Sequence, residues 1–419
     1  MSKSSISQVS LVLVVTVLFC MTLGVASASH PEINVWIKAG PEADALEATA
    51  QAYYLETGNK VNVVTQGRSG FRGVYQTALL AGSKDLDAVH DVGFVVPSLA
   101  AGGMIEPLDS YLAKRDDYNV DDFQSAIQEE MQFEGSWYML PTDMSVESLV
   151  YRTDLIPEPP ATWEELRELA LQFTKAHNPD SPTEYGYAYS GFPGVLHGTW
   201  QGLMYSYGAR IVNEDGKVTL DDENAIESFA FLAGLKNADK VTPQDITAWD
   251  YPELLVALQE GVVAMADFFS AGMPVLIDPE LSPGVYDRVS LAPQPAGPLG
   301  SWTRINPLGL MINSASPRKE ATFDFVYWLT QPNGAKIYTE HGGSSPRISI
   351  MLDPDYAETR PWYAAMYEAG QQGAISIRHS RATLINETFN KWASQVISGV
   401  MSAEDAFNRA AAELRRTIR

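Results

Sequence analysis

The sequence predicts an α/β protein made of two domains, and its length and its hydrophobic patterning are the two observations behind that prediction. The chain has 419 residues, which is too many for one ordinary hydrophobic core and suits two domains of roughly 150–200 residues each. Short β-rich runs alternate with helical patterns through the early part of the chain. Such alternation is typical of a mostly parallel sheet with helices on both faces.

The predicted elements follow one another at short intervals from residue 33 onward. Isoleucine, valine and tryptophan dominate the first β-rich run, and the helical pattern after it stops at Gly58, a residue type that favours helix ends. The predicted order is a strand at 33–37, a helix at 41–57, a strand at 61–64, a helix at 71–82, a strand at 86–89 and a short helix at 97–102.

Helical patterns dominate the second half of the chain. Thr162 and Glu165 have the Thr-x-x-Glu spacing of a capping box, so a helix is predicted at 162–176. The segment 279–300 is rich in proline and glycine, and we expect a loop or a crossing between domains there. Further helices are predicted at 221–236, 251–260, 318–330, 354–369, 380–398 and 402–418.

The N-terminus has the three parts of a secretory signal peptide. Lys3 supplies the positive charge, an apolar run extends from Val9 to Leu23, and Ala26-Ser27-Ala28 offers small residues to a signal peptidase. We therefore expect residues 1–28 to be a signal peptide that is cleaved after Ala28. The mature chain is then periplasmic or otherwise extracytoplasmic.

Two alternatives for this N-terminal segment are an uncleaved membrane anchor and a lipid attached at Cys20. The apolar run is shorter than the ~20 residues that a membrane span needs, and the bulky Phe19 stands where lipoprotein signals have a small residue. Cys20 is the only cysteine. A chain cleaved after residue 28 therefore has no disulfide, no thiol nucleophile and no zinc–thiolate site.

The charge and the motif content exclude several classes of function. The formal net charge is −23, which repels nucleic acid and anionic lipid surfaces and disfavours strongly anionic ligands. The sequence contains no G-x-S-x-G elbow, no Walker loop, no H-E-x-x-H helix and no Cys/His metal pattern. We therefore expect no catalytic residues, no cofactor, no metal site and no nucleic-acid partner.

A series of short motifs, spread over most of the chain, gives the sequence its family resemblance. Each is weak alone, but they occur in a fixed order behind a signal peptide. They are DAVHD at 87–91, A-x-G-x-M-I-x-P-L at 100–108, GSWYMLP at 135–141, YRTDL at 151–155, PPATWEEL at 159–166, EGVVAM at 260–265, GGSSPR at 342–347 and SAEDA at 402–406.

With these motifs the sequence resembles the family 1 extracellular solute-binding proteins of ABC importers, which include maltose-, trehalose- and sorbitol-binding proteins. It departs from the family pattern in having Val262 where the family often has lysine, and Asp267-Phe268-Phe269 where a tryptophan is common. The resemblance implies a two-lobe periplasmic-binding-protein-like fold of type II. Each lobe is expected to be a mostly parallel sheet flanked by helices. About three crossovers of the chain between the lobes form the hinge.

The resemblance also implies lobes that are discontinuous in sequence. The expected crossovers lie near 141–144, 289–293 and 330–334. Lobe 1 is expected to contain residues 29–141 plus 292–331, and lobe 2 residues 144–289 plus 333–419.

A sugar or polyol in the cleft between such lobes needs polar partners for its hydroxyls, and loops after strands are the expected source. The resemblance places Asp91 where the family accepts hydrogen bonds from sugar hydroxyls. On the first crossover, Asp143 and Glu147 share one face of an extended segment. The turns after the first two strands add Gly40, Ser69 and Gly70, whose backbone N–H groups are candidates to meet a ligand oxygen.

Aromatic rings are expected to cover the flat C–H faces of a sugar. The candidates are Trp200 beside a glycine-rich stretch, Phe268 and Phe269 after a strand, and Trp302 in a loop. The planar guanidinium of Arg347 is a candidate to donate hydrogen bonds to a ligand hydroxyl or carboxylate.

The predicted function is capture of a sugar or polyol by a monomer that delivers it to the permease subunits of an ABC importer. A binding protein for another polar solute, such as a sugar acid or glycerol phosphate, and a sensor that docks on a receptor remain alternatives. A glycoside hydrolase is a further alternative. Carboxylate pairs are inevitable among 52 acidic residues, so spacing alone does not identify a catalytic pair.

Overall fold

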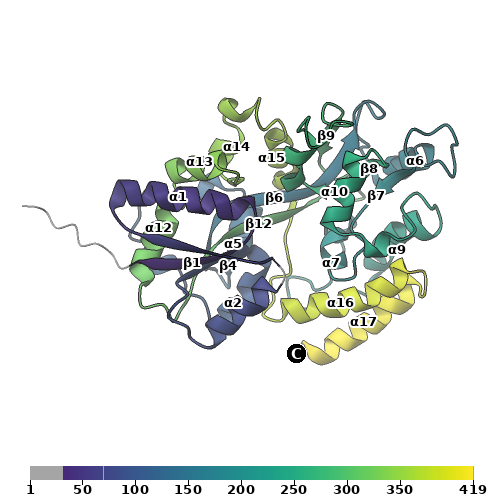
Figure 1. Cartoon of the computed structure of the whole chain (residues 1–419). Coiled ribbons are helices and arrows are strands. Elements are labelled where there is room, and N and C mark those ends of the chain that lie inside the picture. The colour runs from purple at the N-terminus through teal and green to yellow at the C-terminus, as the bar shows by residue number, and fades with distance from the viewer. Residues whose placement is uncertain (1–31, 69, 419) are drawn as a thin grey trace, which may run out of the picture.

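The computed structural model describes residues 32–68 and 70–418. Figure 1 shows two lobes side by side, with the strands β6 (Met139–Arg152) and β12 (Thr303–Ile312) running between them. The sheet order is β2-β1-β3-β12-β6-β8-β7, so one sheet continues through both lobes. The predicted α/β, two-lobe fold of type II is confirmed. The predicted signal peptide, Cys20 and Ser69 lie outside the described residues.

Lobe 1 is built on three parallel strands at one end of the sheet. They are β1 (Ile33–Lys38), β2 (Val61–Gln66) and β3 (Ala88–Val92). The side chains of β1 alternate between buried and half-buried, as expected for a strand with one face on the core. The helices at this end of the sheet are α1 (Pro41–Thr57), α2 (Phe71–Leu80), α3 (Val96–Ala101), α4 (Asp109–Leu112), α5 (Ser125–Met131) and α12 (Lys319–Thr330). Helix α13 (Pro332–Glu340) packs against α1 and α12, although residues from 333 onward are predicted to belong to lobe 2.

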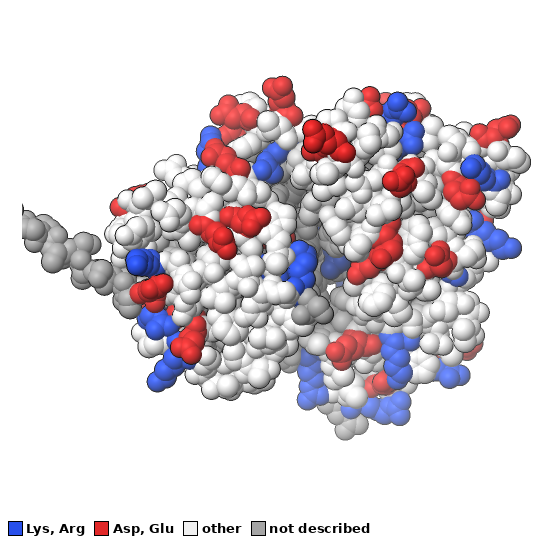
Figure 2. Space-filling view, viewed as in Figure 1, with Lys and Arg blue, Asp and Glu red and all other residues white. Residues whose placement is uncertain are grey.

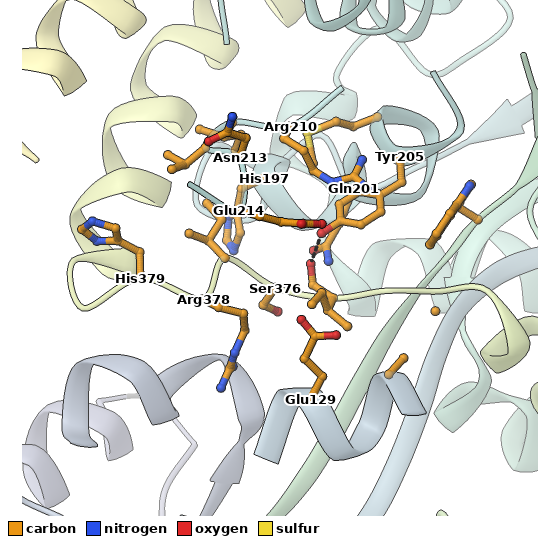
Figure 3. A pocket seen from close by; sticks show the side chains of 18 of the residues that line it. Glu129, His197, Gln201, Tyr205, Arg210, Asn213, Glu214, Ser376, Arg378 and His379 are labelled. Carbon is orange, nitrogen blue, oxygen red and sulfur yellow. Dashed lines mark hydrogen bonds between the residues drawn. The ribbon is translucent and has the colours of Figure 1, made fainter. Parts of the chain in front are cut away.

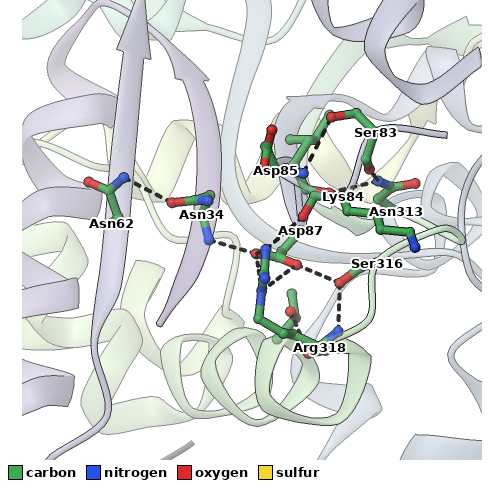
Figure 4. Close-up of polar contacts among 11 residues, drawn as sticks. Asn34, Asn62, Ser83, Lys84, Asp85, Asp87, Asn313, Ser316 and Arg318 are labelled. Carbon is green, nitrogen blue, oxygen red and sulfur yellow. Dashed lines mark hydrogen bonds and ion pairs between the residues drawn. The ribbon is translucent and has the colours of Figure 1, made fainter. Parts of the chain in front are cut away.

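A buried polar network fixes the start of β3 in this lobe (Figure 4). The Asp87 carboxylate accepts hydrogen bonds from the backbone N–H of Asn34 at 2.8 Å and from the Arg318 guanidinium at 3.0 Å. Asn313 donates to the carbonyl oxygens of Ser83 and Leu86, each at 2.7 Å. Because Asp87 is fully buried, this pairing compensates its loss of hydration and joins β1, β3 and α12.

Lobe 2 surrounds the other end of the sheet. Its strands are β7 (Tyr185–Ala188), parallel to β8 (Val263–Phe269), and β9 (Val289–Ala292), antiparallel to β6. Its helices are α6 (Trp163–Gln172), α7 (Leu196–Thr199), α8 (Gln201–Ser206), α9 (Glu223–Asn237), α10 (Tyr251–Gln259), α11 (Met273–Leu276), α16 (Ala382–Ile397) and α17 (Ala403–Thr417).

The remaining elements lie near the boundary of the lobes or form small hairpins. Helices α14 (Ile348–Met351) and α15 (Tyr363–Gln371) precede β13 (Gly373–Ala374), which pairs with the start of β12. Two hairpins consist of β4 (Gln132–Phe133) with β5 (Ser136–Trp137), and of β10 (Ala296–Gly297) with β11 (Gly300–Ser301).

The long strands β6 and β12 pair antiparallel, with an irregularity between Leu308 and Gly309. Gly309 is required there, because a Cβ atom on it would lie 2.3 Å from the carbonyl oxygen of Leu140. The expected crossover at 141–144 falls within β6. The segment 289–293 covers β9, which pairs with residues 149–152 of β6, and 330–334 joins α12 to α13. The lobe boundaries themselves stay a prediction.

Two predicted helices differ from the structure by more than two residues. The helix expected at 354–369 is a 3₁₀ turn followed by α15, because Pro361 disfavours helical backbone at the residue before it. The capped helix expected at 162–176 ends at Gln172. Its start is as predicted, since the Thr162 hydroxyl accepts from the Glu165 N–H at 3.2 Å.

Within residues 32–68 and 70–418, no helix has the length and apolar character needed to cross a bilayer.

Replacing Gly309 by alanine should destabilise the protein, because the new methyl group collides with the backbone of β6. We expect a loss of about 1–3 kcal/mol in the free energy of unfolding, measured by urea denaturation. Gly234 in α9 is the matched control, since a Cβ atom there meets no atom within 4 Å. Gly234→Ala should stabilise the protein by about 0.5–1 kcal/mol, and equal effects at both positions would contradict the steric argument.

Candidate functional site

An ion pair joins β6 and β12, the two strands that run between the lobes and are called the crossing strands below. The Arg304 guanidinium contacts the Glu147 carboxylate at 2.7 Å, and their side chains are only 12% and 3% exposed. Arg304 also lies over the Phe269 ring, 5.4 Å from its centroid. A Cβ atom at Gly198 would lie 2.2 Å from the same guanidinium. Arg304 therefore joins both crossing strands to the end of β8 and to α7.

Asp143 is a second buried carboxylate on β6. Its Oδ2 accepts a hydrogen bond from the backbone N–H of Ser344 at 2.8 Å, and the Ser344 carbonyl accepts from the N–H of Met144 at 2.9 Å. Burial, and then the nearby charge of Glu42, raise the pKa of Asp143 to about 8. Its carboxyl group is therefore mostly neutral at pH 7, which reduces the charge of the boundary between the lobes.

The carboxylate of Asp91 is held entirely by its own lobe. Arg72 donates to it twice, at 2.9 and 3.1 Å, and the Tyr75 hydroxyl donates at 2.7 Å. Burial would raise the pKa of Asp91, but the charge and hydrogen bonds of Arg72 and Tyr75 more than offset it and lower that pKa. Asp91 is thus ionised and already well supplied with donors.

A cavity of about 510 Å³ lies at the boundary between the two lobes (Figure 3). Helix α5 of lobe 1 bounds it on one side and helices α7 and α8 of lobe 2 on the other. The loop 210–216 and the segment 371–379 complete its wall. Its size falls within the ~300–1,000 Å³ of small-molecule sites. Figure 2 shows the molecular surface hollowed along the lobe boundary on one face, with Lys and Arg side chains at its middle.

Two aromatic rings and an arginine form one part of the cavity wall. The rings of Tyr205 and Trp302 are 5.4 Å apart between centroids, at an angle of 54°. The Arg210 guanidinium lies 3.3 Å from the Tyr205 centroid and 5.9 Å from that of Trp302. The Tyr205 hydroxyl donates to the carbonyl oxygen of Ile375 at 2.8 Å, so this ring is fixed to the segment that closes the cavity.

Amide, imidazole and carboxylate groups supply the polar part of the wall. Gln201 donates to the carbonyl oxygen of Ala374 at 2.9 Å, and Glu129 extends from α5 toward the cavity (Figure 3). The buried Oδ1 of Asn386 has no hydrogen-bond partner among the described residues. An unpaired buried polar atom costs about 1–3 kcal/mol, so Asn386 is a candidate to bond a ligand.

His197 lines the same cavity as a neutral side chain. Burial, and then the charge of Arg304, lower its pKa to about 3. The Nδ1 atom of His197 lies 3.3 Å from the Oδ1 atom of Asn390. A neutral imidazole can both donate and accept a hydrogen bond, which suits a hydroxyl group.

The structure places the predicted site residues in three settings. Trp302 lines the cavity. Asp143, Glu147 and Phe269 lie on the crossing strands or beside Arg304, as described above. Gly40 and Gly70 begin α1 and α2, and a Cβ atom on Gly40 would meet Glu42 and Arg68.

Three predicted ligand contacts are wrong, because the side chains are buried in packing. Trp200 is fully buried and stacks on Phe389 at 5.1 Å. Phe268 is 1% exposed and stacks on Tyr251 at 4.8 Å. Arg347 is also 1% exposed, and it bonds Asp122 at 2.8 Å. Each residue is near a strand or loop that the resemblance associates with ligand, but its side chain points into the lobe.

Sequence reasoning missed most of the cavity wall, namely Glu129, His197, Gln201, Tyr205, Arg210 and Asn386. One signal was present: Gln201 and Tyr205 are four residues apart, so they share a face of α8. The ring of the neighbouring Trp200 faces the core instead. Among the described residues, no group of three or more His, Cys, Asp or Glu side chains could hold a metal ion.

Comparison with known proteins supports the fold and points to one family. The model for bacterial extracellular solute-binding proteins matches residues 39–336. A probable amino-acid ABC transporter periplasmic-binding protein of Sinorhizobium fredii is 28% identical over 219 residues, which are 52% of this chain and 47% of that protein. The chain thus aligns with about half the length of that relative.

Two solved structures share the fold over almost the whole chain. One is a maltose-bound protein of T. maritima, with a TM-score of 0.80, 22% identity, and coverage of 92% of this chain and 99% of that one. The other is a solute-binding protein of Agrobacterium radiobacter in complex with ribitol, with a TM-score of 0.80, 22% identity, and coverage of 93% and 99%.

Replacing Arg304 by leucine should destabilise the protein by about 3–5 kcal/mol, because Glu147 is left buried without its partner. The double variant Arg304→Leu/Glu147→Leu should recover most of that loss in urea unfolding. Arg288, whose pair with Asp287 is more than half exposed on both sides, is the matched control, and Arg288→Ala should cost less than about 1 kcal/mol. A double variant no more stable than Arg304→Leu would refute the buried-charge explanation.

The raised pKa of Asp143 predicts a specific pH dependence of stability. The folded state holds this proton up to about pH 8, while the unfolded chain releases it near pH 4. The contribution of Asp143 to the free energy of unfolding therefore falls as pH rises between these values. Compared with wild type, Asp143→Asn should become progressively more stable from pH 5 to pH 8, measured by urea unfolding. A constant difference across this range would disprove the assignment.

Proposed function

Because the chain belongs to the bacterial extracellular solute-binding protein family, we propose that it captures a sugar or polyol in the interlobe cavity and delivers it to the permease subunits of an ABC importer. The observation that carries this proposal is the cavity wall. It combines the Tyr205–Trp302 pair with the amide, imidazole and carboxylate groups of both lobes. Rings cover the C–H faces of a sugar, and the polar groups bond its hydroxyls.

The proposed mechanism is closure of two lobes on a ligand. Glu129 comes from lobe 1, while Gln201 and Tyr205 come from lobe 2, so a bound molecule contacts both. The ligand binds the closed state more tightly than the open state. The difference between these two affinities sets how far binding shifts the protein toward the closed state. The crossing strands carry the hinge, and the chain performs no chemical reaction on its ligand.

The further parts of the proposal concern export and assembly. We infer that a signal peptide of residues 1–28 directs the chain out of the cytoplasm, as the family description of extracellular binding proteins supports. We also propose a monomer whose closed form docks on the importer. Asp143 and Glu147 are proposed to support the site from β6, and Phe269 from the end of β8. Gly40, Ser69 and Gly70 remain predicted contributions from lobe 1, whereas the carboxylate of Asp91 is already bonded to Arg72 and Tyr75.

The name of the Sinorhizobium fredii relative suggests an amino acid as a second class of ligand. An amino acid needs partners for its ammonium and carboxylate groups. Arg210 and Glu129 line the cavity, and they are the groups that could supply such partners. A ligand screen should therefore include amino acids beside saccharides, polyols and sugar acids.

Thermal-shift screening of the mature chain, followed by calorimetry, should identify a saccharide or polyol ligand. A ligand at 100 times its dissociation constant should add ~2.7 kcal/mol to the free energy of unfolding. Trp302→Ala should weaken its binding about tenfold, which corresponds to ~1.4 kcal/mol of lost aromatic contact.

Trp392 is the matched control for that substitution. Its indole donates to Glu413 at 2.9 Å on the surface of α16, and it does not line the cavity. Trp392→Ala should leave the dissociation constant unchanged. If Trp302→Ala also left it unchanged, the ligand would not occupy this cavity, and binding of amino acids alone would reject the sugar assignment.

A further inference from the structure

Arg210 lines the interlobe cavity from the loop 210–216 of lobe 2 (Figure 3). Within residues 32–68 and 70–418 its guanidinium forms no ion pair, and the one hydrogen bond that it donates goes to the carbonyl oxygen of Ala209, at 2.6 Å. A guanidinium carries several N–H donors. Most of those of Arg210 are therefore left for a ligand in the cavity.

Three other arginines near the lobe boundary differ from Arg210, because each is already paired with a carboxylate. The pairs are Arg304 with Glu147, Arg378 with Glu130 and Arg72 with Asp91. Acidic residues outnumber basic ones 52 to 29 in this chain, so an arginine in a cavity wall without an acidic partner is unexpected. The missing partner of Arg210 is one that a ligand can bring.

The Tyr205 ring holds the Arg210 guanidinium in a fixed orientation. The central carbon of the guanidinium lies 3.3 Å from the ring centroid, and the Tyr205 hydroxyl is itself bonded to the carbonyl oxygen of Ile375. Stacking on an aromatic ring uses the flat face of a guanidinium and leaves the N–H groups at its edges. Arg210 therefore presents a preorganised edge, and such an edge matches the two oxygens of a carboxylate.

The charge balance of the cavity favours an anion with a single negative charge. Burial lowers the pKa of Arg210, because its charge is held away from water, and an anion beside it would offset that cost. Glu129 and Glu214 also line the cavity, and they would repel a phosphate group, which carries nearly two charges. Burial raises the pKa of Glu129 against the opposing charge of Arg378, so Glu129 repels a single carboxylate less than an exposed glutamate would.

We propose that the ligand is a sugar acid, that is, a sugar or polyol chain with one carboxylate, and that Arg210 binds this carboxylate. The inference rests on the proposed function, and it names the charged group of the ligand. Trp302 covers a C–H face of the chain, and the unpaired Oδ1 of Asn386 accepts from a hydroxyl. A neutral sugar in the same position would leave the charge of Arg210 without a partner.

Calorimetry of the mature chain tests this inference with pairs of ligands that differ only in the carboxylate: gluconate and sorbitol, glucuronate and glucose, galacturonate and galactose. In the pair that binds, the acid should bind about tenfold more tightly than its neutral counterpart. Arg210→Gln should weaken the acid by about tenfold and the neutral counterpart by less than about twofold, so that the preference disappears. Arg210→Lys keeps the charge but loses the planar fork, and its affinity for the acid should lie between the two.

Arg409 is the matched control for these substitutions. Its guanidinium also lies over an aromatic ring, 5.7 Å from the centroid of Trp392, and it does not line the cavity. Arg409→Gln should leave the dissociation constants of both members of a pair unchanged. Urea unfolding of each variant checks that it is folded, and the comparison of acid with neutral ligand on the wild-type chain needs no variant at all.

The outcomes separate this inference from the proposed function. Neutral sugars or polyols that bind as tightly as their acids would overturn the sugar-acid assignment and leave the proposed function standing. A preference for the acid that persists in Arg210→Gln would remove Arg210 from the site, and tighter binding of glucose 6-phosphate than of any sugar acid would reject the carboxylate. If no sugar, polyol or sugar acid bound, both proposals would fail.

Discussion

The antiparallel pairing of β6 with β12 is the constraint on which the rest of the structure depends. On one side β12 pairs with β3 of lobe 1, and on the other β6 pairs with β8 of lobe 2. Residues 139–151 of β6 are all buried, so both strands are held by packing as well as by hydrogen bonds. The position of each lobe relative to the other follows from this pairing, and so does the space between them.

Buried carboxylates near the lobe boundary are each compensated in a particular way. Arg304 pairs with Glu147, Arg72 with Asp91 and Arg378 with Glu130. Asp143 has no such partner, and burial raises its pKa instead. A chain with a formal charge of −23 thus presents a boundary with little uncompensated negative charge. Hydroxyl groups suit such a surface because they bring no unpaired charge into it, and the single carboxylate that we propose for the ligand would face Arg210.

Local patterns predicted much of the fold. The alternation of β1, α1 and β2 and the capping of α6 depend on residues close in sequence, so they could be read directly. The cavity depends instead on α5, α8 and the segment 371–379, which only tertiary packing brings together. Periodicity could show that Gln201 and Tyr205 share a helix face, but not that this face borders the cavity. Trp302 is predicted because it is a large aromatic ring in a loop. The predictions for Trp200, Phe268 and Arg347 are wrong, because residue type does not reveal which way a side chain points.

The order of strands in lobe 1 has a consequence for how the chain matures. β3 ends at Val92, and its neighbour in the sheet is residues 308–312 of β12. More than two hundred residues must therefore be synthesised before the free edge of β3 acquires its partner, and pairing over such a separation is slow. A fragment ending before residue 303 would keep an open sheet edge prone to association with other chains.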